Sequence, residues 1–320
     1  MTLLEVDNLS LSYRTPTGDV QALRQVSLQA DAGEVVGIMG ESGCGKSTLA
    51  AAIINLLGAN AQVTGGQVRY RGRDILALPA DQQRRLRGRH IGMIFQDPMT
   101  AFNPVLTIGA QLFDFQHHLG GGAGTKWANA QAMLAKVGIP DPALCLRRYP
   151  HELSGGMRQR AAIAAALLLQ PDVLVADEPT TALDVTLEAQ IIHLLRELRQ
   201  DFQGAIIIVT HHLGVIAELC DRVVVMYAGQ VVEQGLVDDI YHAPRHPYTA
   251  ALIACDPGAI ATVGARLPSI GGQLPDLMHP GPGCAFAPRC GQALDLCHTT
   301  APPRVAVSVT HSALCHRVSG

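Results

Sequence analysis

The chain has 320 residues, of which 48% are hydrophobic and 16% are charged, and its formal net charge is −3. This apolar balance excludes an intrinsically disordered chain, and the slightly acidic charge gives no overall signal for nucleic-acid binding. The length suits one large domain with an appendage, or two domains.

The sequence predicts a protein of the reducing cytoplasm. Its first ten residues alternate apolar and acidic side chains, unlike a secretory signal. The longest apolar run, Ala161–Leu169, has nine residues, whereas a membrane-spanning helix needs roughly 20. We therefore expect the eight cysteines to stay free or to bind metal, and any role at a membrane to depend on docking to other subunits.

The first part of the chain predicts strands, a glycine-rich loop and a helix. Two strands with alternating apolar residues flank a turn at Thr15–Gly18, and the helix ends at Gly58. The predicted strands are Leu3–Tyr13, Val20–Leu28, Glu34–Met39, Gln67–Arg71 and Ile91–Gln96, and the predicted helix is Thr48–Leu57.

The rest of the chain changes character twice. From Asp97 to Pro150 the pattern is helical and irregular, with a flexible segment at Gly120–Gly124 and an amphipathic helix near Trp127–Val137. Apolar strands then alternate with helices, which predicts a parallel sheet covered on both faces. Periodicity fades beyond Ala254. The later strands are predicted at Val173–Ala176, Ala205–Val209 and Val223–Tyr227, and the helices at Gly156–Gln170 and Leu187–Gln200.

The glycine-rich loop, Gly40–Ser47, has the sequence GESGCGKS and fits the phosphate-loop pattern G-x-x-x-x-G-K-[ST]. Glycines let backbone N–H groups surround an anion, and the following helix N-terminus adds partial positive charge. Lys46 would reach the β- and γ-phosphates of a nucleotide, and the Ser47 hydroxyl would bind Mg²⁺. Only three of the 24 basic residues are lysines, so a lysine at this position is informative. The alternative is a glycine turn that only caps a helix.

Polar residues follow other predicted strands. Asp177 and Glu178 end a buried strand, where Asp177 could hold Mg²⁺ through water and Glu178 could polarise an attacking water. Gln96 and His211 also end strands, the edge at which parallel α/β sheets place ligand chemistry. Ser154–Gly156 begins a helix and exposes several N–H groups, as an anion site requires. Each feature alone is also compatible with an ordinary strand or helix terminus.

Five motifs occur in one order along the chain. They are the phosphate loop, IFQDP at 94–98, LSGGMRQR at 153–160, VADEPTTALD at 175–184 and VTH at 209–211. Residues 1–235 thereby resemble the ATP-binding cassette (ABC) family. The resemblance implies an α/β fold with a P-loop NTPase core and mostly parallel sheet. It also implies an N-terminal antiparallel β-subdomain, a helical subdomain inserted at about 97–160 and a small Cys-rich extension at 236–320.

The same resemblance implies ATP and Mg²⁺ as cofactors, in a head-to-tail dimer that holds two ATP molecules between subunits. Glu178 would be the general base, His211 the γ-phosphate sensor, and Gln96 the link between Mg²⁺ and membrane subunits. Tyr13 would stack on adenine and Val20 would line the same pocket. The remaining ATP-binding residues would be Ser42, Gly43, Cys44, Gly45, Lys46, Ser47 and Thr48, completed in trans by Ser154, Gly155 and Gly156. The Mg²⁺ ligands would be Ser47, Gln96 and Asp177.

Two departures from the family pattern leave the catalytic groups in place, so we expect hydrolysis. Met157 stands where many cassettes have Gln, and His212 stands where Asp commonly follows the sensor histidine.

Met93–Pro104 and His246–Leu252 resemble the ATPase subunits of oligopeptide, dipeptide and nickel importers. This resemblance implies peripheral attachment at the cytoplasmic face of the membrane. The implied partners are a second, non-identical ATPase subunit, two permease subunits and, indirectly, a solute-binding protein, with no nucleic acid. Peptide uptake is the leading expectation, and nickel or another small solute is the alternative.

Two other functions fit the sequence less well. A soluble cassette ATPase acting on nucleic acid or ribosomes usually has two cassettes, a coiled-coil insertion or a basic surface, and this sequence has none of them. A non-enzymatic metal-binding regulator would not need the intact set Lys46, Asp177, Glu178 and His211.

Four of the eight cysteines lie in the last 37 residues, with the spacing C-x5-C-x6-C-x17-C. Four thiolates suit either an iron–sulfur cluster or zinc. The spacing lacks the C-x2-C pair common in zinc sites, whereas His298, His311 and His316 keep zinc open. Similar importer subunits carry an iron–sulfur cluster at these positions, so the resemblance implies a [4Fe–4S] cluster; a tail without metal is the third alternative. The cysteines are Cys284, Cys290, Cys297 and Cys315.

Other notable residues have plainer interpretations. The basic segment Arg84–Arg89 is predicted to be a solvated loop, with contact to a permease or lipid as the alternative. Cys44 is predicted to be a small filler of the phosphate loop, although a helix N-terminus could lower the pKa of its thiol and make it oxidisable. Cys145, Cys220 and Cys255 lack partners at metal spacing.

Overall fold

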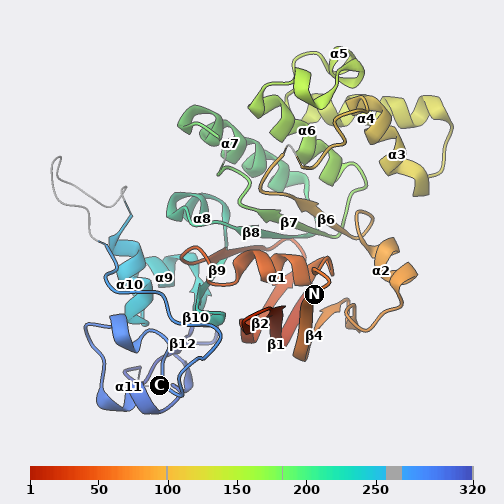
Figure 1. Cartoon of the computed structure of the whole chain (residues 1–320). Helices are drawn as coiled ribbons and strands as arrows, with labels where there is room; N and C mark the ends of the chain where they lie inside the picture. The colour runs from red at the N-terminus through yellow and green to blue at the C-terminus, as the bar shows by residue number, and fades with distance from the viewer. Residues whose placement is uncertain (99, 182, 257–268, 319–320) are drawn as a thin grey trace. The chain divides into compact units, whose positions relative to one another are not determined.

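The structure is a computed structural model that describes residues 1–98, 100–181, 183–256 and 269–318. The chain forms two compact units, each assembled from segments that are distant in sequence (Figure 1). Unit 1 consists of Met1, Asp31–Glu34 and Ala77–Ile208, and unit 2 consists of Thr2–Ala30, Val35–Leu76 and Val209–Gly320.

Unit 2 contains an antiparallel sheet in the order β2-β1-β4-β5. Its first two strands alternate buried and exposed residues, and Thr15 Oγ1 donates a 2.6 Å hydrogen bond to Gly18 O in the turn between them. In the register between β1 and β4, Tyr13 lies opposite Ala61. This sheet confirms the predicted N-terminal β-subdomain. The strands are β1 (Thr2–Thr15), β2 (Gly18–Asp31), β4 (Ala61–Tyr70) and β5 (Arg73–Asp74).

A second set of strands in unit 2 has the order β11-β12-β10-β9-β3. They are β3 (Val35–Met39), β9 (Arg222–Tyr227), β10 (Gln230–Leu236), β11 (Arg304–Ala306) and β12 (Ser312–Leu314). The pair β3–β9 is parallel, as predicted, whereas β9–β10, β10–β12 and β11–β12 are antiparallel. The C-terminal segment therefore adds two short strands, which the sequence did not predict, to strands of the cassette.

The helices of unit 2 flank these strands. Helix α1 ends at Ile53, earlier than the predicted Leu57, because Asn55 adopts a φ of 51° and its side-chain amide donates a 3.1 Å hydrogen bond to Ile75 O. The short helices after β9 carry weak periodicity and were not predicted. The helices are α1 (Lys46–Ile53), α8 (Leu213–Leu219), α9 (Val237–His242), α10 (Pro247–Ala254), η4 (Ala287–Arg289) and α11 (Asp295–Thr299).

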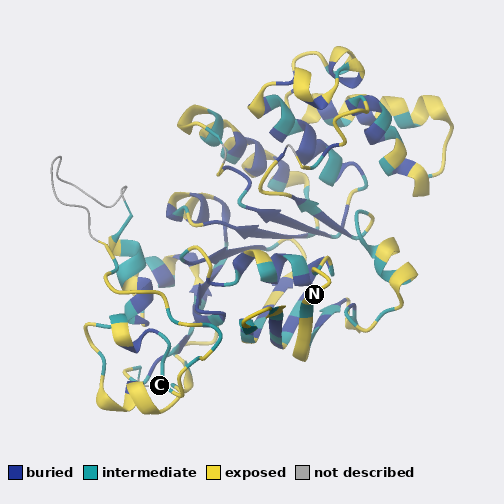
Figure 2. Cartoon of the chain, in the orientation of Figure 1, coloured by how far each residue is buried: buried dark blue, intermediate teal, exposed yellow. Residues whose placement is uncertain are grey.

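Unit 1 contains three strands in the order β8-β7-β6, and β6 pairs with β7 in parallel. They are β6 (Ile91–Ile94), β7 (Val173–Asp177) and β8 (Ala205–Val209). Every residue of β7 and β8 is buried, which explains why both sequences are apolar up to Asp177 at the end of β7 (Figure 2). Both strands were predicted at these positions, and the fold class α/β is confirmed.

Helices make up most of the remainder of unit 1. Helix α4 begins at Ala123, so Gly124 belongs to its first turn and not to the flexible segment that we expected. Helix α6 ends at Leu167, and Gln170 adopts a φ of 50°, which ends the predicted helix early. The helices are α2 (Ala80–Leu86), α3 (Ile108–Phe115), η1 (Gln116–His118), α4 (Ala123–Lys136), α5 (Pro142–Arg147), η2 (Pro150–Glu152), α6 (Gly155–Leu167) and α7 (Val185–Asp201).

None of the helices within the described ranges has the length and apolar character needed to cross a membrane.

Candidate functional site

The phosphate loop follows β3 directly and leads into α1, as the sequence predicts. Gly40 has a φ of 152°, and a Cβ there would lie 2.2 Å from the carbonyl oxygen of Met226. Gly45 has a φ of 104°, and its Cβ would lie 2.6 Å from the carbonyl oxygen of Ala22. Side chains are excluded at both positions, so the loop packs tightly against strands of unit 2. Its exposed rim consists of Ser42, Gly43 and Ser47.

Lys46 folds back over its own loop. The side chain is 5% exposed, and Nζ donates hydrogen bonds to the carbonyl oxygens of Gly40 at 2.7 Å and Glu41 at 3.1 Å. The ammonium is thereby held inside the loop by groups that a phosphate oxygen could replace. This position is compatible with the predicted contact to the β- and γ-phosphates.

Cys44 is a packed residue of the loop. It is 4% exposed, and its carbonyl oxygen accepts a 3.0 Å hydrogen bond from Gly229 N–H. Burial raises the pKa of the Cys44 thiol despite the neighbouring Lys46 ammonium. The alternative of an oxidisable thiol with a lowered pKa is therefore wrong, and the filler interpretation fits the structure.

The two residues predicted to hold adenine lie on the antiparallel sheet of unit 2. Tyr13 on β1 and Val20 on β2 are both half-buried. A cavity of about 760 Å³ lies beside the end of β1 and is lined by residues 14–16 and 59–62, without Tyr13 or Val20 in its wall. The adenine contacts therefore stay a prediction.

His211 follows the end of β8 and belongs to unit 2. The N–H of its neighbour Thr210 donates a 3.1 Å hydrogen bond to Ile38 O on β3, and Thr210 Oγ1 accepts a 3.0 Å bond from His212 N–H. The phosphate loop leaves β3 just after Ile38, so the exposed His211 lies at the same end of the strand as the loop. That placement is what a sensor of the terminal phosphate would need.

In unit 1, two of the predicted catalytic residues contact each other. Glu178 Oε2 accepts hydrogen bonds from Gln96 Nε2 at 3.1 Å and from Thr181 Oγ1 at 2.8 Å. Asp177, the last residue of β7, is 6% exposed. Glu178 has a φ of 47°, an uncommon conformation for a residue with a side chain. The structure thus brings Gln96, Asp177 and Glu178 together at the ends of adjacent parallel strands.

The segment Ser154–Gly156 starts α6 as predicted. Ser154 is the N-cap, and its Oγ accepts a 3.3 Å hydrogen bond from Met157 N–H. Gly155 is exposed, and a Cβ there would have no neighbour within 4 Å. A Cβ on Gly156 would instead lie 2.9 Å from Leu187 Cδ2. The first glycine therefore leaves the helix start accessible to a ligand, while the second permits close packing against α7.

One contact that connects this helix to the carboxylates was not predicted. Gln159 is 1% exposed, and its Nε2 donates a 2.7 Å hydrogen bond to the carbonyl oxygen of Pro179, next to Glu178. Gln159 was visible only as part of the LSGGMRQR motif, which gives no sign of this partner.

The proposed Mg²⁺ ligands offer a hydroxyl, an amide and a carboxylate oxygen. Such hard oxygen donors are the ligands that Mg²⁺ prefers, and the donor set fits this ion. Gln96 and Asp177 belong to unit 1 and Ser47 belongs to unit 2. As a set of ligands they stay a prediction.

The four cysteines of the C-terminal extension line one small cavity. All eight cysteines of the chain are free. Burial raises the pKa of the Cys284 and Cys315 thiols, and neighbouring cysteines raise it further. In the part of the chain that the structure describes, no group of three or more His, Cys, Asp or Glu side chains is arranged to hold a metal ion.

Two of the histidines considered as zinc ligands, His311 and His316, each have a polar partner in the structure. His311 Nε2 lies 2.7 Å from Glu233 Oε1. His316 Nε2 lies 2.9 Å from Thr300 O, and His316 also lines the cysteine cavity. His246 lines the cysteine cavity, and burial lowers its pKa to about 4. Its neutral Nδ1 accepts a 3.1 Å hydrogen bond from Tyr248 N–H at the start of α10.

The extension also contacts the phosphate loop, which the sequence did not predict. Arg289 Nη1 and Nη2 lie 2.7 Å and 2.9 Å from the two carboxylate oxygens of Glu41, and Tyr248 Oη accepts a 2.8 Å hydrogen bond from Glu41 N–H. Near this contact the sequence offered two signals: the segment His246–Leu252, which contains Tyr248, and the position of Arg289 next to Cys290.

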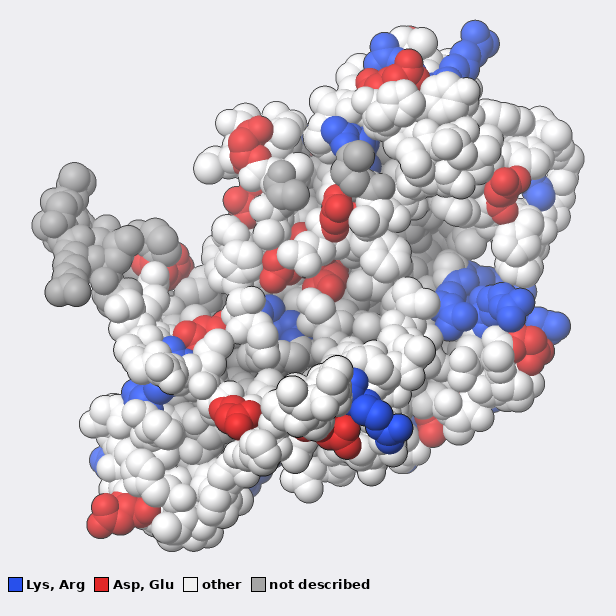
Figure 3. All heavy atoms as spheres, viewed as in Figure 1, with Lys and Arg blue, Asp and Glu red and all other residues white. Residues whose placement is uncertain are grey.

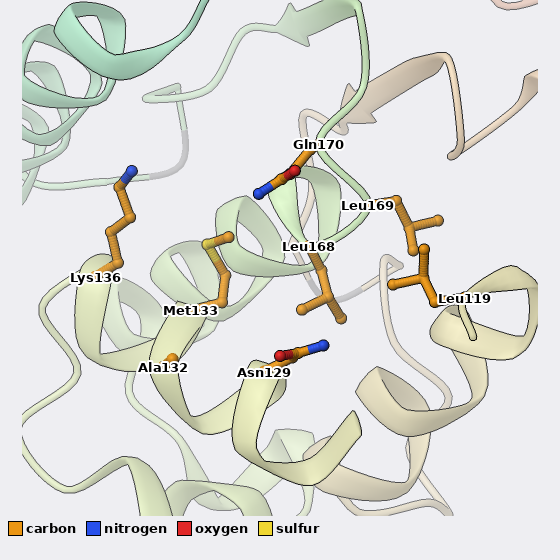
Figure 4. A pocket seen from close by; sticks show the side chains of 8 residues that line it. All are labelled: Leu119, Asn129, Ala132, Met133, Lys136, Leu168, Leu169 and Gln170. Atoms are coloured by element: carbon orange, nitrogen blue, oxygen red, sulfur yellow. The ribbon is translucent and has the colours of Figure 1, made fainter. Parts of the chain in front are cut away.

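Two surface features of unit 1 lie apart from its predicted catalytic residues. Figure 3 shows basic side chains gathered around α2, where Arg84, Arg85 and Arg89 are exposed. Figure 4 shows a pocket of about 320 Å³ between α4 and the end of α6, lined by side chains that include Met133, Leu168 and Gln170.

Comparison with known families gives matches over most of the chain. A model described as ABC transporter matches residues 23–181, and one described as Oligopeptide/dipeptide transporter, C-terminal region, matches residues 232–297. A third, described as AAA domain, putative AbiEii toxin, Type IV TA system, matches residues 146–217.

Curated relatives match nearly the whole chain. The Dipeptide transport ATP-binding protein DppD of Bacillus subtilis is 45% identical over 98% of this chain and 94% of that protein. The Oligopeptide transport ATP-binding protein OppD of Salmonella typhimurium is 45% identical over 98% of this chain and 93% of that protein.

Solved structures also match. One is the ATP-binding cassette MJ0796 in a dimeric post-hydrolysis state bound to ADP and Pi, with 28% identity, a TM-score of 0.65, and coverage of 73% of this chain and 99% of that one. Another is cbiO1 from Clostridium perfringens, with 28% identity, a TM-score of 0.65, and coverage of 76% and 91%.

Proposed function

This chain belongs to the ABC transporter family of ATPases, and from that membership we propose that it is the ATP-hydrolysing subunit of a membrane importer of dipeptides or oligopeptides. The observation that carries the peptide assignment is the match of residues 232–297 to the C-terminal region of oligopeptide and dipeptide transporters. Import of nickel or another small solute is the alternative.

The predicted catalytic residues and Lys46 each have a role in the hydrolysis that we propose. Water attacks the γ-phosphorus of ATP while the bond to the β,γ-bridging oxygen breaks, and ADP and phosphate leave. Glu178 accepts the proton of the water; its carboxylate is held for this by Gln96 and Thr181. Lys46 binds the β- and γ-phosphate oxygens, and His211 contacts the γ-phosphate. Bound Mg²⁺ would neutralise charge on the phosphates.

A second ATPase subunit would complete the site. We assign Ser154, Gly155 and Gly156 to contact the nucleotide bound by the other subunit, because an accessible helix start attracts an anion. The structurally similar MJ0796 cassette is dimeric with ADP and Pi, which supports this arrangement. A non-identical paralogue is the partner that the sequence resemblance favours.

The proposed importer contains further subunits. Two permeases would cross the membrane, and an external binding protein would deliver the solute. The chain would then attach peripherally at the cytoplasmic face of the inner or plasma membrane. We divide it into an ATPase domain at 1–235, with the helical subdomain at about 97–160, and a C-terminal extension at 236–320.

We assign a [4Fe–4S] cluster to Cys284, Cys290, Cys297 and Cys315, with zinc as the alternative. The chemistry of the donors fits, because four thiols line one cavity that has no carboxylate or lysine in its wall. No group of three or more His, Cys, Asp or Glu side chains that could hold a metal ion is found among the described residues, so the assignment rests on the sequence resemblance and on the shared cavity.

The proposed function is tested by uptake of a labelled dipeptide into vesicles that contain the chain with its permeases and second ATPase subunit. We expect Glu178→Gln to lower ATP hydrolysis by at least about 100-fold and to abolish uptake, because the water loses its base. Glu197→Gln is the matched control, since this exposed carboxylate on α7 pairs with His193 on the same helix, and it should leave both rates unchanged. ATP-driven nickel uptake without peptide uptake would contradict the peptide assignment.

A further inference from the structure

The C-terminal extension contacts the phosphate loop at Glu41. Each polar group of Glu41 has a partner. Its N–H donates to Tyr248 Oη at 2.8 Å, and its carbonyl oxygen accepts from Lys46 Nζ at 3.1 Å. Its carboxylate accepts two bonds from Arg289, at 2.7 Å and 2.9 Å. Two of these partners, Tyr248 and Arg289, belong to the C-terminal extension. The extension therefore holds Glu41, the second residue of the phosphate loop, in place.

Arg289 is itself held in place. Its side chain is 4% exposed, and Nε donates to Gly271 O at 2.8 Å. Nη1 also donates to Tyr227 Oη at 3.1 Å, and Nη2 also donates to Ile270 O at 3.0 Å. A guanidinium has five N–H donors, so these bonds and the two to Glu41 use all of them. The guanidinium of Arg289 is therefore held in the orientation that receives the Glu41 carboxylate. Moving it away would break its hydrogen bonds to Gly271, Tyr227 and Ile270.

A carboxylate in a loop that receives a polyphosphate opposes binding by charge repulsion. Arg289 neutralises this charge and holds the carboxylate on the side of the extension. Lys46 can then act on the phosphates without a competing free carboxylate from the same loop.

We propose that Arg289 is a positioning residue of the phosphate loop, through which the C-terminal extension sets the affinity for nucleotide. This inference rests on the proposed nucleotide site at Gly40–Ser47. The opposing interpretation is that Arg289 only anchors the extension. The extension has other anchors, however: β12 pairs with β10, and Gln21 N–H donates a 2.9 Å hydrogen bond to Leu277 O. Removing the Arg289 side chain should therefore leave the extension attached.

The test measures the Kd of the full-length chain for ADP–Mg²⁺ by isothermal titration calorimetry. Arg289→Gln should raise the Kd about tenfold, because the Glu41 carboxylate is left free to repel phosphate. Glu41→Gln should bind at least as tightly as the parent. The double variant should return to within about threefold of the parent, because no unpaired carboxylate remains. In ATP hydrolysis the Arg289→Gln change should appear in KM and leave kcat within about twofold.

The Kd of the double variant separates the two interpretations. If Arg289 only anchored the extension, adding Glu41→Gln in the loop would not restore the Kd that Arg289→Gln had raised. Arg289→Lys keeps the positive charge but loses the two-pronged hydrogen bonding of the guanidinium, so its Kd for ADP–Mg²⁺ should rise by about threefold at most. If Arg289→Gln does not fold, this variant takes its place in the test. A parent-like Kd for Arg289→Gln, or a double variant as weak as Arg289→Gln, would overturn the proposal. Lys46→Ala should abolish ADP binding; unchanged binding there would instead refute the nucleotide site itself.

Discussion

At the scale of single residues, Glu178, the proposed general base, has an uncommon backbone conformation. A side-chain-bearing residue at a φ of 47° costs about 1 kcal/mol or more relative to an ordinary conformation. The conformation turns the chain directly after the buried β7 and leaves the carboxylate within hydrogen-bonding reach of Gln96 and Thr181. The sequence VADE gave the identity of this residue, but its left-handed conformation had no sequence signal.

Cys44 gives a prediction at the same scale. Because burial raises the pKa of its thiol, little thiolate is present at pH 7.5, and iodoacetamide should modify it slowly. ATP hydrolysis by the untreated and the iodoacetamide-treated chain should then agree within about twofold. Cys44→Ser is the control: inactivation of the parent but not of this variant would show that the thiol is reactive.

At the scale of elements, the two glycines at the start of α6 have different surroundings: Gly155 is accessible and Gly156 is packed. A Cβ on Gly156 would meet Leu187 of α7, whereas one on Gly155 would meet nothing. We expect Gly156→Ala to lower the free energy of unfolding by at most about 1 kcal/mol in urea denaturation, because the Leu187 methyl group that it meets ends a half-buried side chain that can turn aside. Gly155→Ala should leave that free energy nearly unchanged or slightly higher, yet lower ATP-dependent dimerisation because a methyl group obstructs the helix start.

These two variants are matched in chemistry and adjacent in sequence. A loss of stability well above about 1 kcal/mol in Gly156→Ala would contradict a movable Leu187 side chain, and normal dimerisation of Gly155→Ala would contradict the contact that we assign to the second subunit. Light scattering with ATP and a hydrolysis-deficient background provides the second measurement.

Sequence reasoning succeeded where an element has strong local periodicity. The strands β3, β7 and β8 are short and buried, and they are apolar except for Asp177 at the end of β7; their limits were predicted to within one residue. Elements after β9 were missed because β11 and β12 have only three residues each, and their pairing depends on partners far away in the chain. The phosphate loop follows a local pattern, whereas Arg289 and Glu41 are 248 positions apart and share none.

At the scale of the whole molecule, the four-cysteine cavity predicts bound iron. The full-length chain purified without oxygen should contain about four irons and show the visible absorbance of an iron–sulfur cluster. Cys290→Ser should lose most of both, because one thiolate ligand is removed. Cys255→Ser is the matched control, since Cys255 ends α10 and does not line the cavity. One zinc and no iron would select the alternative metal, and neither metal would refute the assignment.

The hairpin of β11 and β12 has a further consequence for how the chain tolerates shortening. Strand β10 hydrogen-bonds to β9 on one side and to β12 on the other. Without the hairpin, the backbone N–H and C=O groups of Glu233 and Gln234 would become an unsatisfied sheet edge, and such edges recruit strands from other molecules. The hairpin of β11 and β12 thus protects the edge of β10 from pairing with another molecule. A chain truncated before Arg304 should therefore aggregate even when its nucleotide site is intact.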